Sequence, residues 1–316
     1  MRGFRFRRES ARLAAGPVRA ESPVDKPKTW IDPVEDSLIP PRALWINPDD
    51  SITHYARWIW EYLAYLTIVA GLQRGDSVLE LGCGHGRVAR GLLSYLRSPG
   101  RYVGLDVDAR RLDDARARIT ARWPNFEFVR ADVHSELYNS AGAASAAEYR
   151  FPFEDGSFDV IYAASLFTHL LPAEAENYFR ESGRVLNRGG RCLFSCFVLD
   201  YYRGPGTSIS PGYEFDHGLP GHDGVAVREP GAPASAISYT LARLHAMASA
   251  AGLHVDRVLP GLWAEGPGWA TNEQDLLVLT RAASPSAATR VGAEGILGLD
   301  LGRADVAADP HHLPSS

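Results

Sequence analysis

The sequence is almost devoid of lysine. Its 33 basic residues are all arginine except Lys26 and Lys28, which lie near the N-terminus. With 38 acidic residues, the formal net charge is −5 at pH 7. A chain with this charge balance has no general electrostatic attraction to nucleic acid or to an anionic membrane. We therefore expect neither of them as its partner.

Cysteine is also scarce. The chain contains only Cys83, Cys192 and Cys196, which are too few for a disulfide framework. The last two lie in one predicted strand, roughly 13 Å apart at about 3.3 Å per residue, a separation too large for a disulfide bond. Three free thiols are typical of a protein in a reducing compartment.

Long apolar runs are absent as well. No stretch approaches the roughly 18 apolar residues that a transmembrane helix requires. The N-terminal stretch MRGFRFRRESARL is basic but lacks the apolar segment of a secretory signal. We expect a cytoplasmic protein without integral membrane association, and the sequence does not specify its oligomeric state.

The two ends of the chain differ in composition from its middle. Residues 1–50 are predicted to form a mostly irregular N-terminal arm, and residues 283–316, rich in Ala, Ser, Gly and Pro, a flexible C-terminal tail. The remaining residues, 51–282, can bury one large core and are predicted to form a single domain. Within it, residues 200–236 combine prolines, glycines and aromatics, which indicates an insertion that acts as a lid.

Strand-like and helix-like segments alternate through the middle of the chain. The predicted strands are residues 77–81, 101–106, 126–132, 158–165, 191–199, 253–259 and 274–281. The predicted helices are residues 58–66, 86–96, 109–123, 173–187 and 238–252. This alternation predicts an α/β fold with a doubly wound, mostly parallel, Rossmann-like sheet. Ligands of such folds bind beyond the carboxyl ends of the strands.

Three glycines follow the first predicted strand. Residues 78–92 read VLELGCGHGRVARGL, so Gly82, Gly84 and Gly86 occupy alternate positions. They permit a tight turn and a close approach of backbone to a ligand, although they can also serve only to turn the chain. The dinucleotide fingerprint needs Gly or Ala at its sixth position, where this chain has Arg87. Glu80 would repel a pyrophosphate but suits a cationic group, so the loop is predicted to bind a nucleoside without phosphates.

Two acidic residues end the next two strands. Asp106 lies 22 residues after Gly84, where an acid in such folds accepts hydrogen bonds from ribose hydroxyls. Asp132 ends the third strand and is placed to accept a hydrogen bond from an adenine amino group, with Val133 beside the ring. For both acids the alternative role is a helix N-cap.

Five ordered stretches resemble class I S-adenosylmethionine-dependent methyltransferases, in particular the small-molecule branch typified by ubiquinone and menaquinone biosynthesis enzymes. They are VLELGCGHGRV, YVGLDVD, FVRADV, FPFEDGSFDVIYAASLFTHL and YFRESGRVLNRGGRCLFS, all between about residues 77 and 199. The resemblance implies S-adenosylmethionine as the cofactor and a seven-stranded sheet with its last strand antiparallel. The residues predicted to contact the cofactor are Glu80, Gly82, Cys83, Gly84, Gly86, Asp106, Val107, Asp132, Val133, Ala164 and Ser165.

The acceptor is predicted partly from missing motifs. The chain has AASLFTHL where amino-methylating DNA enzymes carry an Asn/Asp-Pro-Pro-aromatic motif, and it lacks the lysines that ribose-methylating RNA enzymes of the lysine-containing tetrad type need. A small-molecule hydroxyl, for example that of a sugar or a lipid-linked glycan, is therefore predicted as the acceptor. His169, just past the fourth strand, is the candidate general base. Its alternative role is capping or packing of the next helix.

Acceptor contacts are predicted in less typical parts of the chain. Tyr55 and Tyr62 share one face of the helix before the first strand, where such a stripe is either core or a lid. The insertion contributes His217 and His222. Trp263, like Trp269, lies in the last long loop and is either buried or a stacking surface for a ring. A cation site made by Asp216, His217, His222 and Asp223 is an alternative, but no metal ion is expected.

These observations predict a methyltransferase that acts on a hydroxyl of a small molecule. A carbon or nitrogen acceptor is the alternative within the class. Outside it, the alternatives are a nicotinamide-dependent oxidoreductase, which Arg87 disfavours, and a nucleoside-binding protein without catalysis.

Overall fold

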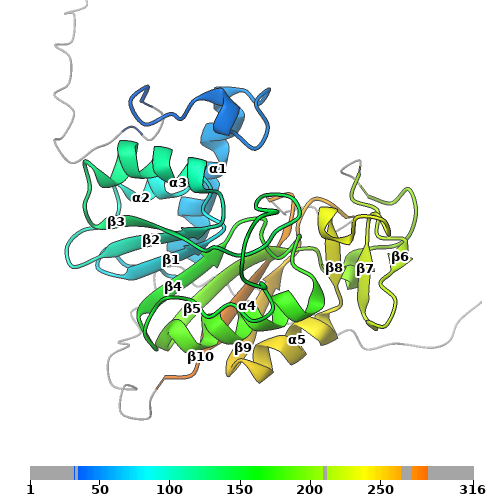
Figure 1. The fold of residues 1–316 in the computed structure, drawn as a ribbon. Helices are drawn as coiled ribbons and strands as arrows, with labels where there is room; N and C mark the ends of the chain where they lie inside the picture. Colours follow the sequence, from blue (N-terminus) through cyan, green and yellow to red (C-terminus); the bar gives the residue numbers. More distant parts are fainter. Residues whose placement is uncertain (1–31, 33–34, 209–211, 265–271, 284–316) are drawn as a thin grey trace, which may run out of the picture.

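The computed structural model describes residues 32, 35–208, 212–264 and 272–283 (Figure 1). Their centre is a seven-stranded sheet with the order β3-β2-β1-β4-β5-β10-β9. The five strands from β3 to β5 are parallel, and β10 runs antiparallel to both of its neighbours. The strands are β1 (Ser77–Leu81), β2 (Arg101–Asp106), β3 (Phe126–Arg130), β4 (Phe158–Ala163), β5 (Leu186–Cys196), β9 (Leu253–Leu259) and β10 (Asp275–Arg281). The predicted fold class and the antiparallel last strand are confirmed.

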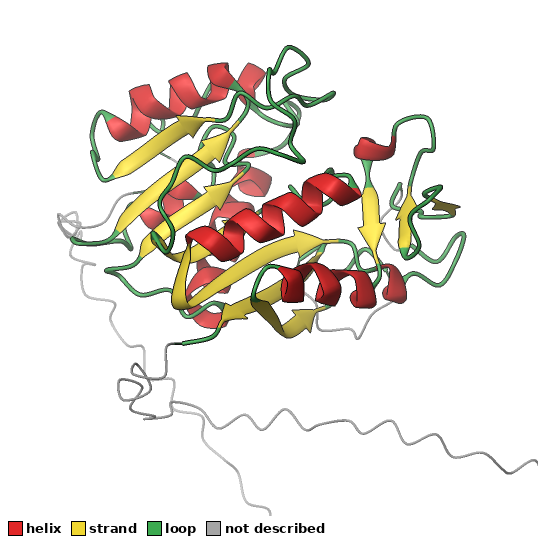
Figure 2. Ribbon diagram, turned by 60° about the horizontal axis from the view of Figure 1, so that its bottom comes forward, coloured by secondary structure: helices red, strands yellow, loops and turns green. Residues whose placement is uncertain are grey.

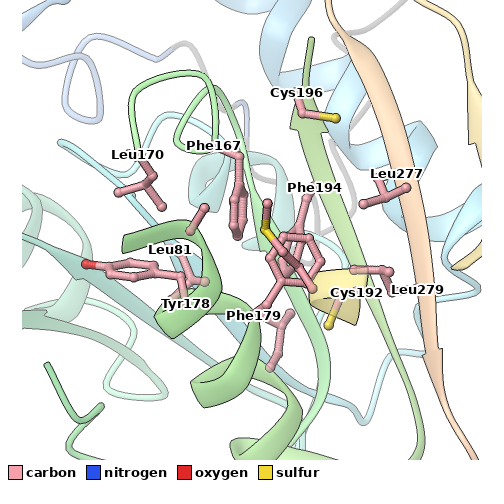
Figure 3. Packing of buried hydrophobic residues seen from close by; sticks show 14 of the residues in the cluster. Leu81, Phe167, Leu170, Tyr178, Phe179, Cys192, Phe194, Cys196, Leu277 and Leu279 are labelled. Carbon is pink, nitrogen blue, oxygen red and sulfur yellow. The ribbon is translucent and has the colours of Figure 1, made fainter. Parts of the chain in front are cut away.

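Helices cover both faces of this sheet (Figure 2). One face packs against α1 (Ile52–Ala64), α2 (Ala89–Leu92) and α3 (Ala109–Ala115), and the other against α4 (Pro172–Val185) and α5 (Leu241–Ala250). Because strand side chains alternate, Val78 and Leu79 of β1 belong to the cores on opposite faces. Figure 3 shows the α4 side, where Phe167 and Phe179 stack around Phe194 of β5. Burial on both faces explains the nearly continuous apolar strands.

Several element boundaries differ from the prediction. The predicted helix over 86–96 is α-helical only in α2, with turns on either side. The helix over 109–123 continues from α3 as a wider π-helical turn, Arg116–Thr120. The predicted helix over 238–252 begins at Leu241, because Thr240 caps it by accepting a hydrogen bond from the Arg243 amide. The residues just before it form β8 (Ile237–Tyr239).

The insertion contains a second, small antiparallel sheet. It consists of β6 (His217–Gly218), β7 (Val225–Val227) and β8, in that order. The Tyr239 amide donates to the Phe197 carbonyl at 3.0 Å, so the small sheet is attached where β5 ends (Figure 1). Val225, Val227 and Ile237 are buried in the main core. This part of the chain is therefore an integral layer of the domain, and its role as a lid stays a prediction.

The described part of the N-terminal arm packs onto the domain. It is irregular except for a short 3₁₀ turn, Arg42–Leu44, as predicted for an irregular arm. Leu38 and Trp45 are nonetheless buried, and the Leu38 carbonyl accepts a hydrogen bond from Arg90 Nε at 2.7 Å. The C-terminal tail prediction falls almost wholly on residues 284–316, which lie outside the described residues.

Candidate functional site

The glycine loop connects β1 to α2 and depends on glycine for its shape. Gly82, Gly84 and Gly86 have φ angles of +74°, +54° and +74°, which side chains of L-residues rarely adopt. A Cβ atom on Gly86 would lie 2.9 Å from the Phe128 ring of β3. The third glycine therefore permits the close packing that the dinucleotide fingerprint assigns to its sixth position, while Arg87 points elsewhere, over the Tyr55 ring of α1.

Glu80 is buried at the end of β1, with only 2% of its surface exposed. Its Oε2 accepts hydrogen bonds from the hydroxyls of Tyr162, at 2.7 Å, and Tyr102. Burial raises the pKa of Glu80 to about 8 in spite of these two donors. At neutral pH the carboxyl therefore carries little negative charge, and the charge argument against pyrophosphate is weaker than the sequence alone suggested. Its contact with the cofactor stays a prediction.

Asp106 joins the loop to the end of β2. Its Oδ2 accepts a hydrogen bond from the Gly84 amide at 2.6 Å, and its Oδ1 accepts one from the Asp108 amide at 2.9 Å. The cap of α3 is Asp108, whose side chain accepts from the amides of Arg110 and Arg111. The capping alternative for Asp106 is therefore wrong. A carboxylate has about four acceptor positions, so two remain for other donors.

The structure places the remaining predicted cofactor contacts at the same strand ends with different exposure. The Asp132 carboxylate is 57% exposed beside Arg130, at 3.3 Å. Val107 is partly buried, and Val133 is buried in the core behind a bridge to Ala144. The Cys83 side chain is likewise buried, so only its backbone remains available to a ligand. The cofactor contacts predicted for these residues stay predictions.

Ser165 begins a polar cluster after β4, and Ala164 just before it is half-buried. Ser165 has a φ of +59°, the only positive φ outside glycine among the described residues. Its amide donates to Ser195 Oγ at 2.7 Å, and both serine hydroxyls donate to Gln274 Oε1, at 3.0 and 2.7 Å. Sequence reasoning missed Ser195 and Gln274. Buried polar residues in otherwise apolar strand segments were the available signal.

His169 lies between the β4 end and the insertion. Its Nδ1 is 2.9 Å from the Ala234 carbonyl and must donate to it, which leaves the lone pair on Nε2. Burial lowers its pKa below the usual value for histidine. Tyr138, from the loop after β3, contacts the imidazole edge-on with ring centroids 6.3 Å apart. The imidazole is therefore neutral and oriented, and its role as a general base stays a prediction.

The predicted acceptor residues separate in space. Tyr55 and Tyr62 are fully buried under the domain surface, with the Tyr55 hydroxyl 3.4 Å from His85 Nδ1. His217 and His222 are exposed on the insertion. Their part in acceptor binding stays a prediction.

Trp263 corrects one prediction. Its side chain is fully buried and its Nε1 donates to Asp275 Oδ2 at 2.8 Å, so it offers no stacking surface. The indole packs against Phe197 and Phe215 because burying a large ring here closes the core beside β5. Trp269 lies outside the described residues.

The described part of the chain holds no group of three or more His, Cys, Asp or Glu side chains arranged to bind a metal ion. Within the same ranges, no helix has both the length and the apolar character needed to cross a bilayer.

Comparisons with known proteins agree with this arrangement. A family profile described as a methyltransferase domain matches residues 78–190. The fatty-acid O-methyltransferase of Mycolicibacterium smegmatis is 28% identical over 49% of this chain and 48% of its own length. The 2-phytyl-1,4-naphtoquinone methyltransferase of Trichormus variabilis is 31% identical over 46% of this chain and 54% of its own length. The chain thus spans about half the length of these relatives.

One solved structure is similar at low sequence identity. The S-adenosylmethionine dependent methyltransferase of Mesorhizobium loti superposes with a TM-score of 0.47, at 16% identity over 71% of this chain and all of that chain. The sequence matches, the order of the seven strands and the glycine loop tied to Asp106 lead to one assignment. Residues 78–190 belong to the class I S-adenosylmethionine-dependent methyltransferases.

Proposed function

We propose that this protein transfers a methyl group from S-adenosylmethionine to a hydroxyl of a small molecule. The observation that carries the proposal is the His169 imidazole, whose Nδ1 donates to the Ala234 carbonyl and whose Nε2 keeps a lone pair, in a chain whose glycine loop is tied to Asp106. A sugar or lipid-linked glycan is the first acceptor class to screen. A carbon or nitrogen acceptor remains the alternative within the class, since the relatives include a sterol 24-C-methyltransferase of Saccharomyces cerevisiae, 28% identical over 47% of this chain and 34% of its own length.

The residues at the strand ends fit the cofactor. Asp106 would hold both ribose hydroxyls with its two remaining acceptor positions, and the exposed Asp132 would receive the adenine amino group. The positive φ angles of the glycine loop let its backbone come close to the methionine part. When bound, S-adenosylmethionine supplies an electrophilic methyl group on a sulfonium, so no metal ion is needed for activation.

The chain's own contribution to the chemistry is alignment and proton removal. His169 Nε2 carries a lone pair, because Nδ1–H is held by the Ala234 carbonyl. In this proposal it accepts the proton of the acceptor hydroxyl, which makes the oxygen a better nucleophile. The small sheet of the insertion would exclude water from the reacting atoms and position the acceptor.

Calorimetry with S-adenosylhomocysteine and NAD tests the cofactor. Binding of S-adenosylhomocysteine with no response to NAD is expected, and binding of NAD alone would overturn the proposal. A panel of sugar, lipid, phenol, amine and carboxylic-acid acceptors is then incubated with methyl-tritiated S-adenosylmethionine. Label recovered on a hydroxyl oxygen supports the proposal, whereas label only on nitrogen or carbon supports the alternative. Cofactor binding with no labelled product from any class indicates a nucleoside-binding protein without catalysis.

A further inference from the structure

Two arginines directly follow the glycine loop and have no acidic partner. Arg87 is partly buried and Arg90 is fully buried. Among the ion pairs of the described residues, neither guanidinium lies within 4.0 Å of a carboxylate. Buried charges in proteins are almost always paired or bound to a ligand, because removing them from water is costly. Two unpaired cations at one loop therefore require an explanation.

Arg90 has a structural explanation. Its Nε donates to the Leu38 carbonyl at 2.7 Å, and its Nη1 donates to the carbonyls of His85 and Gly86 at 2.6 and 2.5 Å. These bonds tie the N-terminal arm and the glycine loop to α2. Only Nη2 is buried without a partner. Arg90 thus stabilises the loop and the N-terminal arm.

Arg87 has no comparable partners. Its guanidinium carbon lies 4.9 Å from the centroid of the Tyr55 ring and 5.5 Å from that of Trp58, both on α1. Such stacking fixes the orientation of a guanidinium while leaving its N–H groups available. Within the described ranges, no hydrogen bond from the Arg87 side chain accompanies these ring contacts. The planar set of N–H donors of Arg87 is therefore oriented by the two rings, and no acceptor among the described residues binds it.

Asp50 acts on this cation from a distance but forms no ion pair with it, and its carboxylate lies 3.8 Å from His54 Nε2 instead. His85 is neutral, because burial lowers its pKa well below the usual value and both arginines add to the effect. Glu80 is occupied by Tyr102 and Tyr162, and burial raises its pKa to about 8. Asp106 accepts from backbone amides. Arg90 and Arg111 add positive charge near Arg87, so an anionic group beside its guanidinium is favoured.

We propose that Arg87 binds the carboxylate of the methionine part of the cofactor, with Tyr55 and Trp58 holding its guanidinium in position. The inference rests on the proposed cofactor. S-adenosylmethionine carries a neutral adenine, a neutral ribose, a cationic sulfonium and a cationic ammonium group. Its carboxylate is the one anionic group, and guanidinium recognises carboxylates through paired, charge-assisted hydrogen bonds. Tyr55 thereby acts as a positioning residue rather than as an acceptor contact.

The test compares two ligands that differ by the carboxylate. Calorimetry measures the binding of S-adenosylhomocysteine and of its decarboxylated amine analogue to the wild-type protein and to Arg87→Met, which removes the charge but keeps an apolar stem. We expect the substitution to weaken S-adenosylhomocysteine binding by roughly 10–100-fold and to leave the affinity for the amine within about twofold. Arg87→Lys keeps the charge without the fork and should restore part of the loss.

Arg110→Met is the matched control, because Arg110 is exposed at the start of α3, away from the rings of α1. It should change neither affinity. If Arg87→Met weakens both ligands equally, Arg87 only shapes the loop and the inference is wrong. If it spares both but raises KM for an acidic acceptor, the anion belongs to the acceptor and the inference is equally wrong. Failure of the wild-type protein to bind S-adenosylhomocysteine would instead contradict the proposed function.

Discussion

The two halves of the strand-end surface are assembled in different ways. On the donor half, Asp106 and Gly84 lie 22 residues apart on neighbouring strand–loop units and meet in one 2.6 Å hydrogen bond. On the proposed acceptor half, His169 meets Ala234 across 65 residues, and Val198 meets Asp275 across 77. The donor half is thus built mainly from local segments, although Tyr162 reaches Glu80 across 82 residues, and the acceptor half is built from long-range contacts. Site residues that lie close together in the sequence form a recognisable motif, whereas site residues that lie far apart in the sequence do not.

The difference extends to what each half can tolerate. Asp106 is held by backbone amides, which no side-chain substitution elsewhere removes, whereas Glu80 accepts from the side chains of Tyr102 and Tyr162. The acceptor half depends on buried side chains, such as Asp275 accepting from Trp263 and from the amides of Val198 and Gly261. Removing residues 205–230 as a test of a lid would therefore break the core, since Val225 and Val227 belong to it. Point substitutions therefore test the role of the insertion more specifically than a deletion does.

The largest expected effect is on the acceptor half. His169→Ala should lower the methylation rate by about 10²–10⁴-fold, because the acceptor hydroxyl loses its base, while cofactor affinity is unchanged. Burial lowers the pKa of His169, so the wild-type rate should rise with pH through an inflection below about 6.5, where the imidazole loses its proton. Rate–pH profiles of both proteins measure this. A variant with the full rate and the same inflection would show that His169 is structural.

A smaller effect is expected on the donor half. Asp106→Ala should weaken S-adenosylhomocysteine binding by about 1–3 kcal/mol, because the ribose hydroxyls and the Gly84 amide lose a charged acceptor. Asp108→Ala is the control, since it removes only the cap of α3 and should cost about 1 kcal/mol of stability with affinity retained. Calorimetry and thermal unfolding separate the two. Equal affinity losses in both variants would argue for a shared effect on folding.

The buried tryptophan tests the correction made on the acceptor half. Trp263→Phe should lower the free energy of unfolding by about 1–3 kcal/mol, because a volume loss accompanies the loss of a buried hydrogen bond to Asp275. The neighbouring Leu262 is 40% exposed, and Leu262→Ala should cost less than about 0.5 kcal/mol. Denaturant unfolding measures both. If Trp263→Phe leaves the stability unchanged but abolishes acceptor binding, Trp263 is a ligand contact after all.

The smallest effect is a pH slope on the donor half. Burial raises the pKa of Glu80 to about 8, above its usual value of 4.5, so the folded protein holds a proton that the unfolded chain has released. This contribution is complete below about pH 4.5 and is lost as the pH rises through 8. Between pH 6 and 8, wild-type stability should fall relative to Glu80→Gln by up to roughly 1.4 kcal/mol per pH unit. Parallel unfolding curves for the two proteins would mean that Glu80 ionises freely.

Much of the donor half could be predicted from sequence. Gly82, Gly84 and Gly86 could be predicted because positive φ angles favour glycine, and Asp106 because an acid at the end of the second strand is typical of such folds. The missed details are side-chain directions. The amino-acid sequence alone does not show that Glu80 faces two tyrosines, or that Asp108 rather than Asp106 caps α3.

The alternation of apolar strands and amphipathic helices by itself determined the α/β sheet. The family resemblance added its antiparallel last strand. These features follow from local periodicity and from backbone conformations that only certain residues adopt. Only the tertiary structure decided that Trp263 is buried, that Ser195 and Gln274 meet Ser165, and that Arg87 lies unpaired between aromatic rings. Those facts depend on contacts between segments distant in the chain, and burial and pairing are properties of the packed neighbours rather than of the residue itself.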